Sequence, residues 1–439
     1  MAVLGIIGIL IAVFIMIFGA YKGLGAIPLT LLASLVIILC NGIPVWTGYS
    51  EYYMAGFTGT LSAYLLMFMA SCLYAKFMDV SGAAKAVAMT LLDKLGKKNV
   101  LWALAIITII LTWGGVSLFV ALFVIGPIGI AMLKEANLPR HLLLASFAIG
   151  GGAISVTSLP GTTQLTNVIP SEFLGTPLTA APVLSIILSA VQLVIGLWYM
   201  KRVQKKSIAA GEVWSDEGLA MRVRQMERSE LPVVWKGIVP IVFMIAAIII
   251  LTQHVTNTTM LTTACMLVAA LICLFLNLDK FKGQDMKKVI GDGLSDGVTA
   301  IIGLACVVAF GTVVQYSAAF SNIAGWVMGL NLSPYWKGVV STAVISGVTG
   351  SGSGGLRLVF QNFGEYFMGS GCNLQILHRL CALASGTLDS LPHNSGLFLV
   401  FAYLGLNHKQ GYKHYWWMTV VVPAIVVIAA TLIITAAGM

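Results

Sequence analysis

Long apolar runs, separated by short polar segments, make up most of this chain. A helix needs about 17–25 apolar residues to cross a bilayer, and many runs are this long without interruption. They cover roughly residues 3–19, 25–40, 61–77, 179–200, 236–252, 260–278, 296–315 and 415–436. The pattern predicts an all-α polytopic membrane protein. The first run lacks a preceding basic segment and a small-x-small cleavage motif, so we expect a retained span.

Four further apolar regions are interrupted by glycine, proline and polar residues. They are residues 100–131, 141–174, 336–369 and 376–407, with breaks at 112–115, 158–162, 349–355 and 390–396. We interpret the first and third as re-entrant hairpins and the other two as broken helices. Unwound backbone survives in a membrane only where protein or an aqueous cavity surrounds it. Paired breaks of this kind mark transporter binding sites, so we expect the four breaks to meet.

The two halves of the chain repeat one order of elements. Residues 1–200 and residues 236–439 each contain three spans, a hairpin, a broken helix and a last span, and residues 201–235 link them. The motif Ser158-Leu159-Pro160 recurs as Ser390-Leu391-Pro392. A hairpin that enters and returns on one side adds no crossing, so each half crosses an odd number of times. We therefore predict two inverted repeats.

The composition excludes a soluble protein. Of 439 residues, 59% are hydrophobic and only 9% are charged, whereas soluble domains carry about 25% charged residues. Soluble enzymes, fibrous proteins and nucleic-acid-binding proteins are therefore poor fits. The seven cysteines lie mostly in apolar stretches, with no CxxC or Cys/His cluster. We expect neither disulfides nor a metal site.

The positive charges, which give a formal net charge of +9, concentrate between the spans. The linker is the richest in them, with Lys201, Arg202, Lys205, Lys206, Arg222, Arg224 and Arg228. The positive-inside rule assigns the linker to the cytoplasm. Counting outward, the external loops carry no Lys or Arg; they are 41–60, 170–178, 253–259 and 316–335. Both termini are then predicted to be external, with the first hairpin open to the cytoplasm and the second to the outside.

Arg357 directly follows the Gly-Ser tip of the second hairpin. Charge inside a bilayer is costly and usually functional, and an arginine beside a helix N-terminus suits a carboxylate. Arg357, Gln361 and Glu365 are spaced four apart and share one helix face. Arg357 is therefore a candidate for substrate or gating contact, and an internal ion pair or a snorkelling side chain is the alternative.

Asp389 is the acid that we place nearest the bilayer centre in a crossing helix, and His393 follows it in the break. Both residue types can bind and release protons, so a proton relay through Asp389 and His393, with Glu365 as a further candidate, is one hypothesis. A second is that Asp389 hydrogen-bonds the unwound backbone. Sodium coordination is a third.

Uncharged polar residues crowd the breaks. The first broken helix contains such a run from Thr162 to Asn167, which suits hydrogen bonding to hydroxyl or carboxylate groups in a small wet pocket. Capping of the broken backbone is the alternative for any single member. The predicted substrate-binding residues are Ser117, Thr162, Thr163, Gln164, Asn167, Ser351, Ser353, Arg357, His393, Asn394 and Ser395.

Residues 384–396, Ala-Ser-Gly-Thr-Leu-Asp-Ser-Leu-Pro-His-Asn-Ser-Gly, and residues 405–413, Gly-Leu-Asn-His-Lys-Gln-Gly-Tyr-Lys, resemble the gluconate permease (GntP) family. The hydroxybutyrate-permease-like branch is the most similar. The gluconate branch typically has Asp where this chain has Asn394, which favours a smaller hydroxy or short-chain acid. The resemblance implies a proton symporter of the ion-transporter superfamily, in a bacterial inner membrane. It also implies an elevator architecture, with scaffold and transport domains, and a homodimer.

These observations predict a secondary active transporter that couples protons to import of a small organic monocarboxylate, such as hydroxybutyrate, lactate or gluconate. Its partners would be that acid and the bilayer, without nucleic acid, and it would need no cofactor beyond the coupling ion, H⁺ or alternatively Na⁺. A sodium-coupled symporter and a cation/proton antiporter are the alternatives. An intramembrane enzyme would need a nucleophile–base pair or a metal cluster, so we do not expect an enzyme.

Overall fold

The computed structural model describes residues 2–438 apart from 114–117, 163, 218–227, 252–254 and 256–257. All regular structure in these residues is helical, as the apolar pattern predicts. The first half contains α1 (Ala2–Tyr21), α2 (Ala26–Cys40), α3 (Val45–Thr47), η1 (Gly48–Tyr53), α4 (Met54–Val80), α5 (Ala83–Leu95), η2 (Lys97–Asn99), α6 (Val100–Trp113), α7 (Leu118–Ala136), α8 (His141–Phe147), η3 (Ala148–Ser158), α9 (Leu165–Leu174) and α10 (Pro182–Ala209).

The rest of the chain, from the linker onward, is also helical. It contains η4 (Arg228–Glu230), α11 (Trp235–Leu251), α12 (Thr258–Leu276), α13 (Leu278–Phe281), α14 (Met286–Gln315), α15 (Ala318–Gly329), α16 (Pro334–Thr349), α17 (Gly352–Gly369), α18 (Leu374–Leu388), α19 (Ser395–Leu404), α20 (His408–Trp416), η5 (Trp417–Val421) and α21 (Val422–Ala436). The described residues include seven helical stretches that are long and apolar enough to cross a membrane, or eight if the bent α5–α6 pair is one span. The chain is thus a helical membrane protein of many spans.

Three details differ from the sequence-based expectation. Helix α10 continues to Ala209, so the first part of the predicted linker 201–235 is helical. Helix α5 occupies a segment between the third span and the first hairpin for which the sequence analysis predicts no helix. Helix α15 occupies much of the predicted external loop 316–335. The third span of each half is therefore followed by a short helix rather than by an extended loop.

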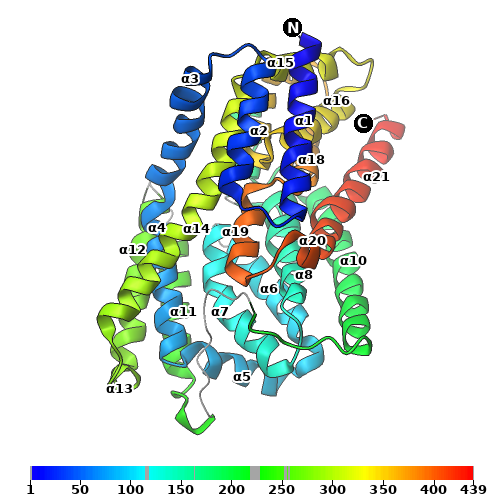
Figure 1. Ribbon diagram of the computed structural model, residues 1–439. Coiled ribbons are helices and arrows are strands. Elements are labelled where there is room, and N and C mark those ends of the chain that lie inside the picture. Colours follow the sequence, from blue (N-terminus) through cyan, green and yellow to red (C-terminus); the bar gives the residue numbers. More distant parts are fainter. Residues whose placement is uncertain are drawn as a thin grey trace.

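Helices α4 and α14 are the third long helices of the two halves, and they pack against each other in opposite directions. In Figure 1 they run side by side down one edge of the molecule. Small residues permit the contact, because a Cβ atom added at Gly297 would lie 2.6 Å from the Met69 Cα atom. Near the other end of the pair, a Cβ at Gly56 would lie 2.8 Å from the Ala309 Cα atom. The two helices thus touch almost backbone to backbone.

Both chain ends lie toward the same end of the molecule, together with α15 (Figure 1). Helices α5 and α13 lie at the opposite end, as does the chain that follows α10. Helix α19, the second part of one broken helix, lies in the middle, between α14 and α8 in this view.

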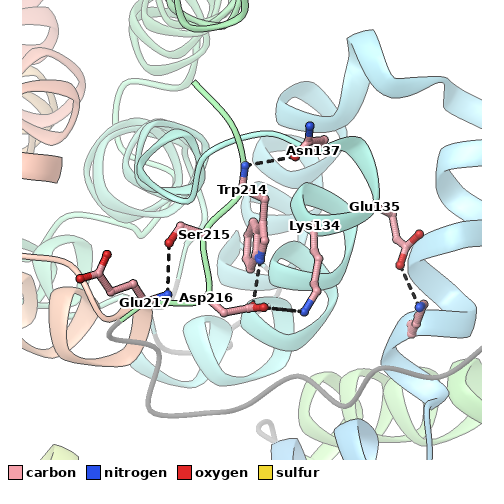
Figure 2. Close-up of polar contacts among 8 residues, drawn as sticks. Lys134, Glu135, Asn137, Trp214, Ser215, Asp216 and Glu217 are labelled. Atoms are coloured by element: carbon pink, nitrogen blue, oxygen red, sulfur yellow. Dashed lines mark hydrogen bonds and ion pairs between the residues drawn. The ribbon is translucent and has the colours of Figure 1, made fainter. Parts of the chain in front are cut away.

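Residues 214–217 of the linker are attached to the end of α7 (Figure 2). Lys134 Nζ lies 3.0 Å from a carboxylate oxygen of Asp216, and the backbone N–H of Trp214 donates to Asn137 Oδ1 at 3.3 Å. Burial raises the pKa of the Asp216 carboxyl, but hydrogen bonds from Trp214 and Lys134, together with the positive charges of Lys134 and Arg140, keep that pKa below its usual value. Arg140 extends the attachment, because it donates to the carbonyls of Leu404 and Glu217.

Candidate functional site

Helices are interrupted at three places in the described residues. Helix α16 ends at Thr349 and α17 begins at Gly352, so Gly350 and Ser351 form the tip of the second hairpin. Helix α18 ends before Asp389, and α19 begins at Ser395. In the first half, the segment between η3 and α9 spans residues 159–164. Residues 114–117, which include the predicted Ser117, lie outside the described residues, as does Thr163.

Two side chains attach the second hairpin to the second broken helix. His393 Nε2 lies 2.8 Å from the carbonyl oxygen of Gly347. Asn394 Nδ2 donates to the carbonyls of Gly350, at 3.1 Å, and Asp389, at 2.9 Å. Gly350 has a positive φ of 63°, and an added Cβ would lie 3.0 Å from the His393 ring. A glycine at this tip therefore meets both a conformational and a steric requirement.

The first hairpin is attached to the first broken helix in a similar way. Gln164 Nε2 donates to the carbonyl of Thr112 at 2.9 Å. Trp113 Nε1 donates to the carbonyl of Pro160 at 3.0 Å. These contacts pair the carbonyl of Thr112, in the last turn of α6, and the carbonyl of Pro160, in the break. Each broken helix is thus held to the hairpin that precedes it.

A cavity of about 370 Å³ lies where these segments meet. Its polar lining includes Thr157, Gln164, Thr166, Thr259, Thr262, Ser351, Ser353, Asp389, Ser390, Asn394, Ser395 and Tyr415. Its apolar lining includes Met67, Leu118, Leu122, Phe147, Val156, Leu165 and Val400. The volume lies within the range of about 300–1,000 Å³ that is usual for small-molecule sites.

Three helices begin at this cavity. The first residues of α9 (Leu165), α17 (Gly352) and α19 (Ser395) all line it. Helix N-termini carry unpaired backbone N–H groups and a partial positive charge, so they attract anions. Among the described lining residues none is Lys or Arg. The arrangement can therefore hold an anion through neutral donors and helix ends.

Asp389 supplies the carboxylate among the described lining residues of the cavity. Ser390 Oγ donates to Asp389 Oδ1 at 2.9 Å, and the backbone N–H of Gly352 also hydrogen-bonds this carboxyl group. A Cβ added at Gly352 would lie 2.8 Å from Asp389 Oδ2. The Asp389 carboxyl group thus lies at the N-terminus of α17, which is a position that an anionic ligand would also favour.

The predicted site residues divide into three groups. Gln164, Ser351, Ser353, Asn394 and Ser395 line the cavity, together with Asp389. Arg357 instead lines a second, adjoining cavity, and its Nη2 atom lies 3.8 Å from Glu172 Oε2.

The other predicted residues lie away from both described linings. Glu365 is exposed on α17. Asn167 donates to the carbonyls of Thr162 and Leu178, and its Oδ1 atom lies 2.8 Å from His378 Nε2, so it joins the two halves instead. Thr162 is fully buried, and its hydroxyl accepts the backbone N–H of Gln164 at 3.4 Å. His393 is buried behind the lining.

Several lining residues were not predicted. Tyr64 and Met67 belong to α4, and Thr259 and Thr262 belong to α12. These helices are uninterrupted spans, so no glycine or proline signal draws attention to them. Thr262 lies one turn after the start of α12, and the sequence offers no signal that a threonine at this position lines a cavity.

Comparison with known proteins identifies the family. A model of the GntP permease family matches residues 2–438. The chain belongs to the GntP permease family. The resemblance of residues 384–413 to gluconate permeases is thereby confirmed, and this GntP permease is a multi-span membrane transporter of a family with bacterial members.

Related GntP-family proteins differ in what their names say. The uncharacterized transporter YxjC of Bacillus subtilis (strain 168) is 26% identical over 441 residues, which is 92% of this chain and 93% of that protein. The gluconate permease of the same bacterium is 34% identical over 110 residues, 25% of this chain and 24% of that protein. The Gnt-II system L-idonate transporter of Escherichia coli (strain K12) is 25% identical over 301 residues, 64% of this chain and 65% of that protein.

Proposed function

We propose that this GntP permease imports a small organic monocarboxylate together with protons. The observation that carries the proposal is the convergence of three helix N-termini on a cavity whose charged side chain, among the described lining residues, is the carboxyl group of Asp389. The helix ends provide attraction for an anion. The Asp389 carboxyl group provides a place for the coupling proton.

Asp389 and the substrate carboxylate compete for the N-terminus of α17. This competition couples binding of the proton to binding of the substrate. While ionised, Asp389 occupies the N-terminus of α17 and repels a second carboxylate in a cavity of low dielectric. Protonation removes that repulsion and weakens the hold of Asp389 on the Gly352 N–H group, because hydrogen bonds to charged groups are the stronger ones. The substrate carboxylate can then use the helix end. The anion is therefore bound well only when the proton is bound as well.

Coupling of this kind is required on energetic grounds. Moving one negative charge into a negative-inside cell costs about 2.3 kcal/mol per 100 mV. One proton per monoanion removes that cost and lets the pH gradient drive uptake. A gradient of one pH unit is worth about 1.4 kcal/mol, or about tenfold accumulation at one proton per substrate.

We further propose that transport proceeds by an elevator movement between two inverted repeats. Reciprocal packing supports this proposal, because α2 packs on α14 while α12 packs on α4, and α1 packs on α15 while α11 packs on α5. The antiparallel α4–α14 pair would belong to the scaffold, and the hairpins and broken helices would carry the substrate. We propose external termini from the distribution of Lys and Arg between the spans. We propose an inner-membrane location and a homodimer from the resemblance to the GntP family.

The substrate class follows from the cavity and from the relatives. Two relatives are named as gluconate and L-idonate transporters, and both names denote hydroxy acids. Hydroxyl groups of Ser351, Ser353 and Ser395 line the cavity and can serve the hydroxyl groups of such an acid. We propose a hydroxy monocarboxylate, with 3-hydroxybutyrate and lactate as candidates beside gluconate.

The test is uptake of radiolabelled gluconate, 3-hydroxybutyrate and lactate into proteoliposomes with an imposed pH gradient, acid outside. At least one acid should accumulate about tenfold per pH unit. The variant Asp389→Asn should lose this accumulation but keep exchange of labelled for unlabelled substrate, because its side chain cannot carry the proton. Full proton-driven accumulation by Asp389→Asn would overturn the coupling role of this residue.

The same preparation distinguishes the alternatives. An imposed sodium gradient at equal pH should drive no accumulation, and accumulation under that condition would establish sodium coupling instead. Cation-dependent proton release without any acid present would indicate an antiporter. Two or more protons per substrate would make uptake respond to an inside-negative potential as well as to pH.

A further inference from the structure

A second cavity of about 290 Å³ adjoins the first one. It lies between α9, α14 and the tip of the second hairpin, and Leu165 of α9, Thr312 and Gln315 of α14 and Arg357 of α17 line it. The cavity is therefore walled by elements from both halves of the chain.

Arg357 is the one cationic side chain among the described residues that line either cavity. Its Nη2 atom lies 3.8 Å from Glu172 Oε2, and the two side chains are 48% and 55% exposed. An ion pair this long and this exposed contributes little to stability. The guanidinium group has further N–H donors available, and its flat fork fits a carboxylate better than a single long contact does.

The two cavities share a wall. Ser351, Ser353 and Ser395 line both of them. Ser353 precedes Arg357 by one helical turn of α17, so the two side chains share a helix face. A carboxylate released by Arg357 therefore meets, within one turn, the hydroxyl group of Ser353, which also lines the main cavity.

We propose that the second cavity is a separate carboxylate-binding vestibule, in which the substrate displaces Glu172 from Arg357 before it enters the main cavity. The inference rests on the proposed function, since it assumes a carboxylate substrate. Glu172 acts as an internal competitor that occupies Arg357 when no substrate is present. The vestibule supplies the attraction by full charge that the main cavity lacks, and such attraction raises the rate of encounter at low salt.

The experiment compares three variants in the proteoliposome assay, with the accumulating acid as probe. Arg357→Gln should raise the half-saturation concentration about tenfold, as expected for loss of one charge-assisted hydrogen bond, with the maximal rate nearly unchanged. Glu172→Gln should lower the half-saturation concentration, because the competitor is gone. Lys337→Gln is the matched control: Lys337 belongs to the same hairpin, but its Nζ atom lies 5.0 Å from the centre of the Tyr366 ring and it lines neither cavity.

Ionic strength gives an independent readout. For the unmodified protein the half-saturation concentration should rise with salt, because salt screens charges over about 8 Å at 0.15 M. Arg357→Gln should lose most of that dependence, whereas Arg357→Lys, which keeps the charge, should retain it. Lys337→Gln should behave like the unmodified protein.

The inference and the proposed function fail separately. If no acid accumulates in the unmodified protein, the proposed function is wrong. If an acid accumulates but Arg357→Gln keeps its half-saturation concentration and salt dependence, the vestibule is wrong alone. A fall in maximal rate of the same size in Arg357→Gln and Glu172→Gln would also overturn the vestibule, because it would identify their ion pair as a latch between α9 and α17.

Discussion

His393 is a buried side chain that contacts the hairpin next to it, yet it does not line the described cavities. Its Nε2 atom lies 2.8 Å from the Gly347 carbonyl, so this nitrogen must carry the hydrogen. Its Nδ1 atom has no hydrogen-bond partner in the described part of the chain. This contact indicates that His393 holds the second hairpin to the second broken helix. Participation of His393 in a proton relay stays a hypothesis.

The substitution His393→Gln distinguishes fastening from proton transfer. A glutamine amide can place an N–H group near the Nε2 position but cannot titrate. We expect proton-driven uptake by His393→Gln within about twofold of normal. His393→Ala should lower the thermal stability of the protein, because it leaves the buried Gly347 carbonyl without a hydrogen-bond donor. Loss of proton-driven accumulation in His393→Gln, with exchange retained, would instead support the relay.

Residue types predicted part of the cavity lining, whereas the orientations of side chains could not be predicted from the sequence. Gln164, Ser351 and Ser395 were identified from polar runs beside glycine and proline, and they line the cavity. Asn167 belongs to the same run, but its amide faces His378 of the other half. Sequence gives the spacing along one helix but not the partner across it, so such contacts between halves could not be foreseen.

Asn394 holds the second broken helix together at its break. Its Oδ1 atom accepts the Leu397 N–H at 2.9 Å and so caps α19. Its Nδ2 group donates to the carbonyls of Gly350 and Asp389. One amide therefore starts a helix and joins the break to the hairpin tip.

The substitution Asn394→Asp should weaken this element. A carboxylate can still cap α19, but it cannot donate to the two carbonyls, and we expect a loss of about 1–3 kcal/mol in unfolding free energy. Thermal unfolding in detergent measures it. Asn99→Asp is the control, because Asn99 is exposed and its amide donates to the Leu95 carbonyl at 2.8 Å; that change should stay within about 0.5 kcal/mol. Equal effects of the two substitutions would contradict the role of Asn394.

Glycine and proline positions predicted the ends of helices better than the spacing of hydrophobic residues did. Glycine and proline located the breaks near Gly161, Gly350 and Pro392, since proline clashes with the preceding helical turn and glycine adopts the positive φ found at Gly161 and Gly350. The helices α5 and α15 were missed. The first lies in a lysine-rich segment that looks like a loop, and the second is short and lies between two apolar spans. Tertiary packing against α11 and α1 accompanies these helices, and sequence does not display it.

The orientation of the whole molecule remains a prediction. It can be tested with single cysteines at Ser215, in the docked linker, and at Ala437, after the last helix, both of which are exposed. Of the cysteines in the described residues, Cys40 and Cys372 are only partly buried, so they should be replaced by serine first. A membrane-impermeant maleimide should label Ala437→Cys in intact cells, and Ser215→Cys only after the cells are opened. Labelling of both positions in intact cells would contradict the predicted orientation.

The contact between α4 and α14 has a consequence for how such a protein can change over evolutionary time. One extra methyl group at Gly297 would lie 2.6 Å from Met69 Cα, and backbone atoms cannot move aside as a flexible side chain can. Side chains on the lipid-facing surface can be exchanged freely as long as they stay apolar. The small residues where α4 meets α14 cannot be exchanged in this way. We therefore expect descendants of this sequence to diverge elsewhere while these residues stay nearly unaltered.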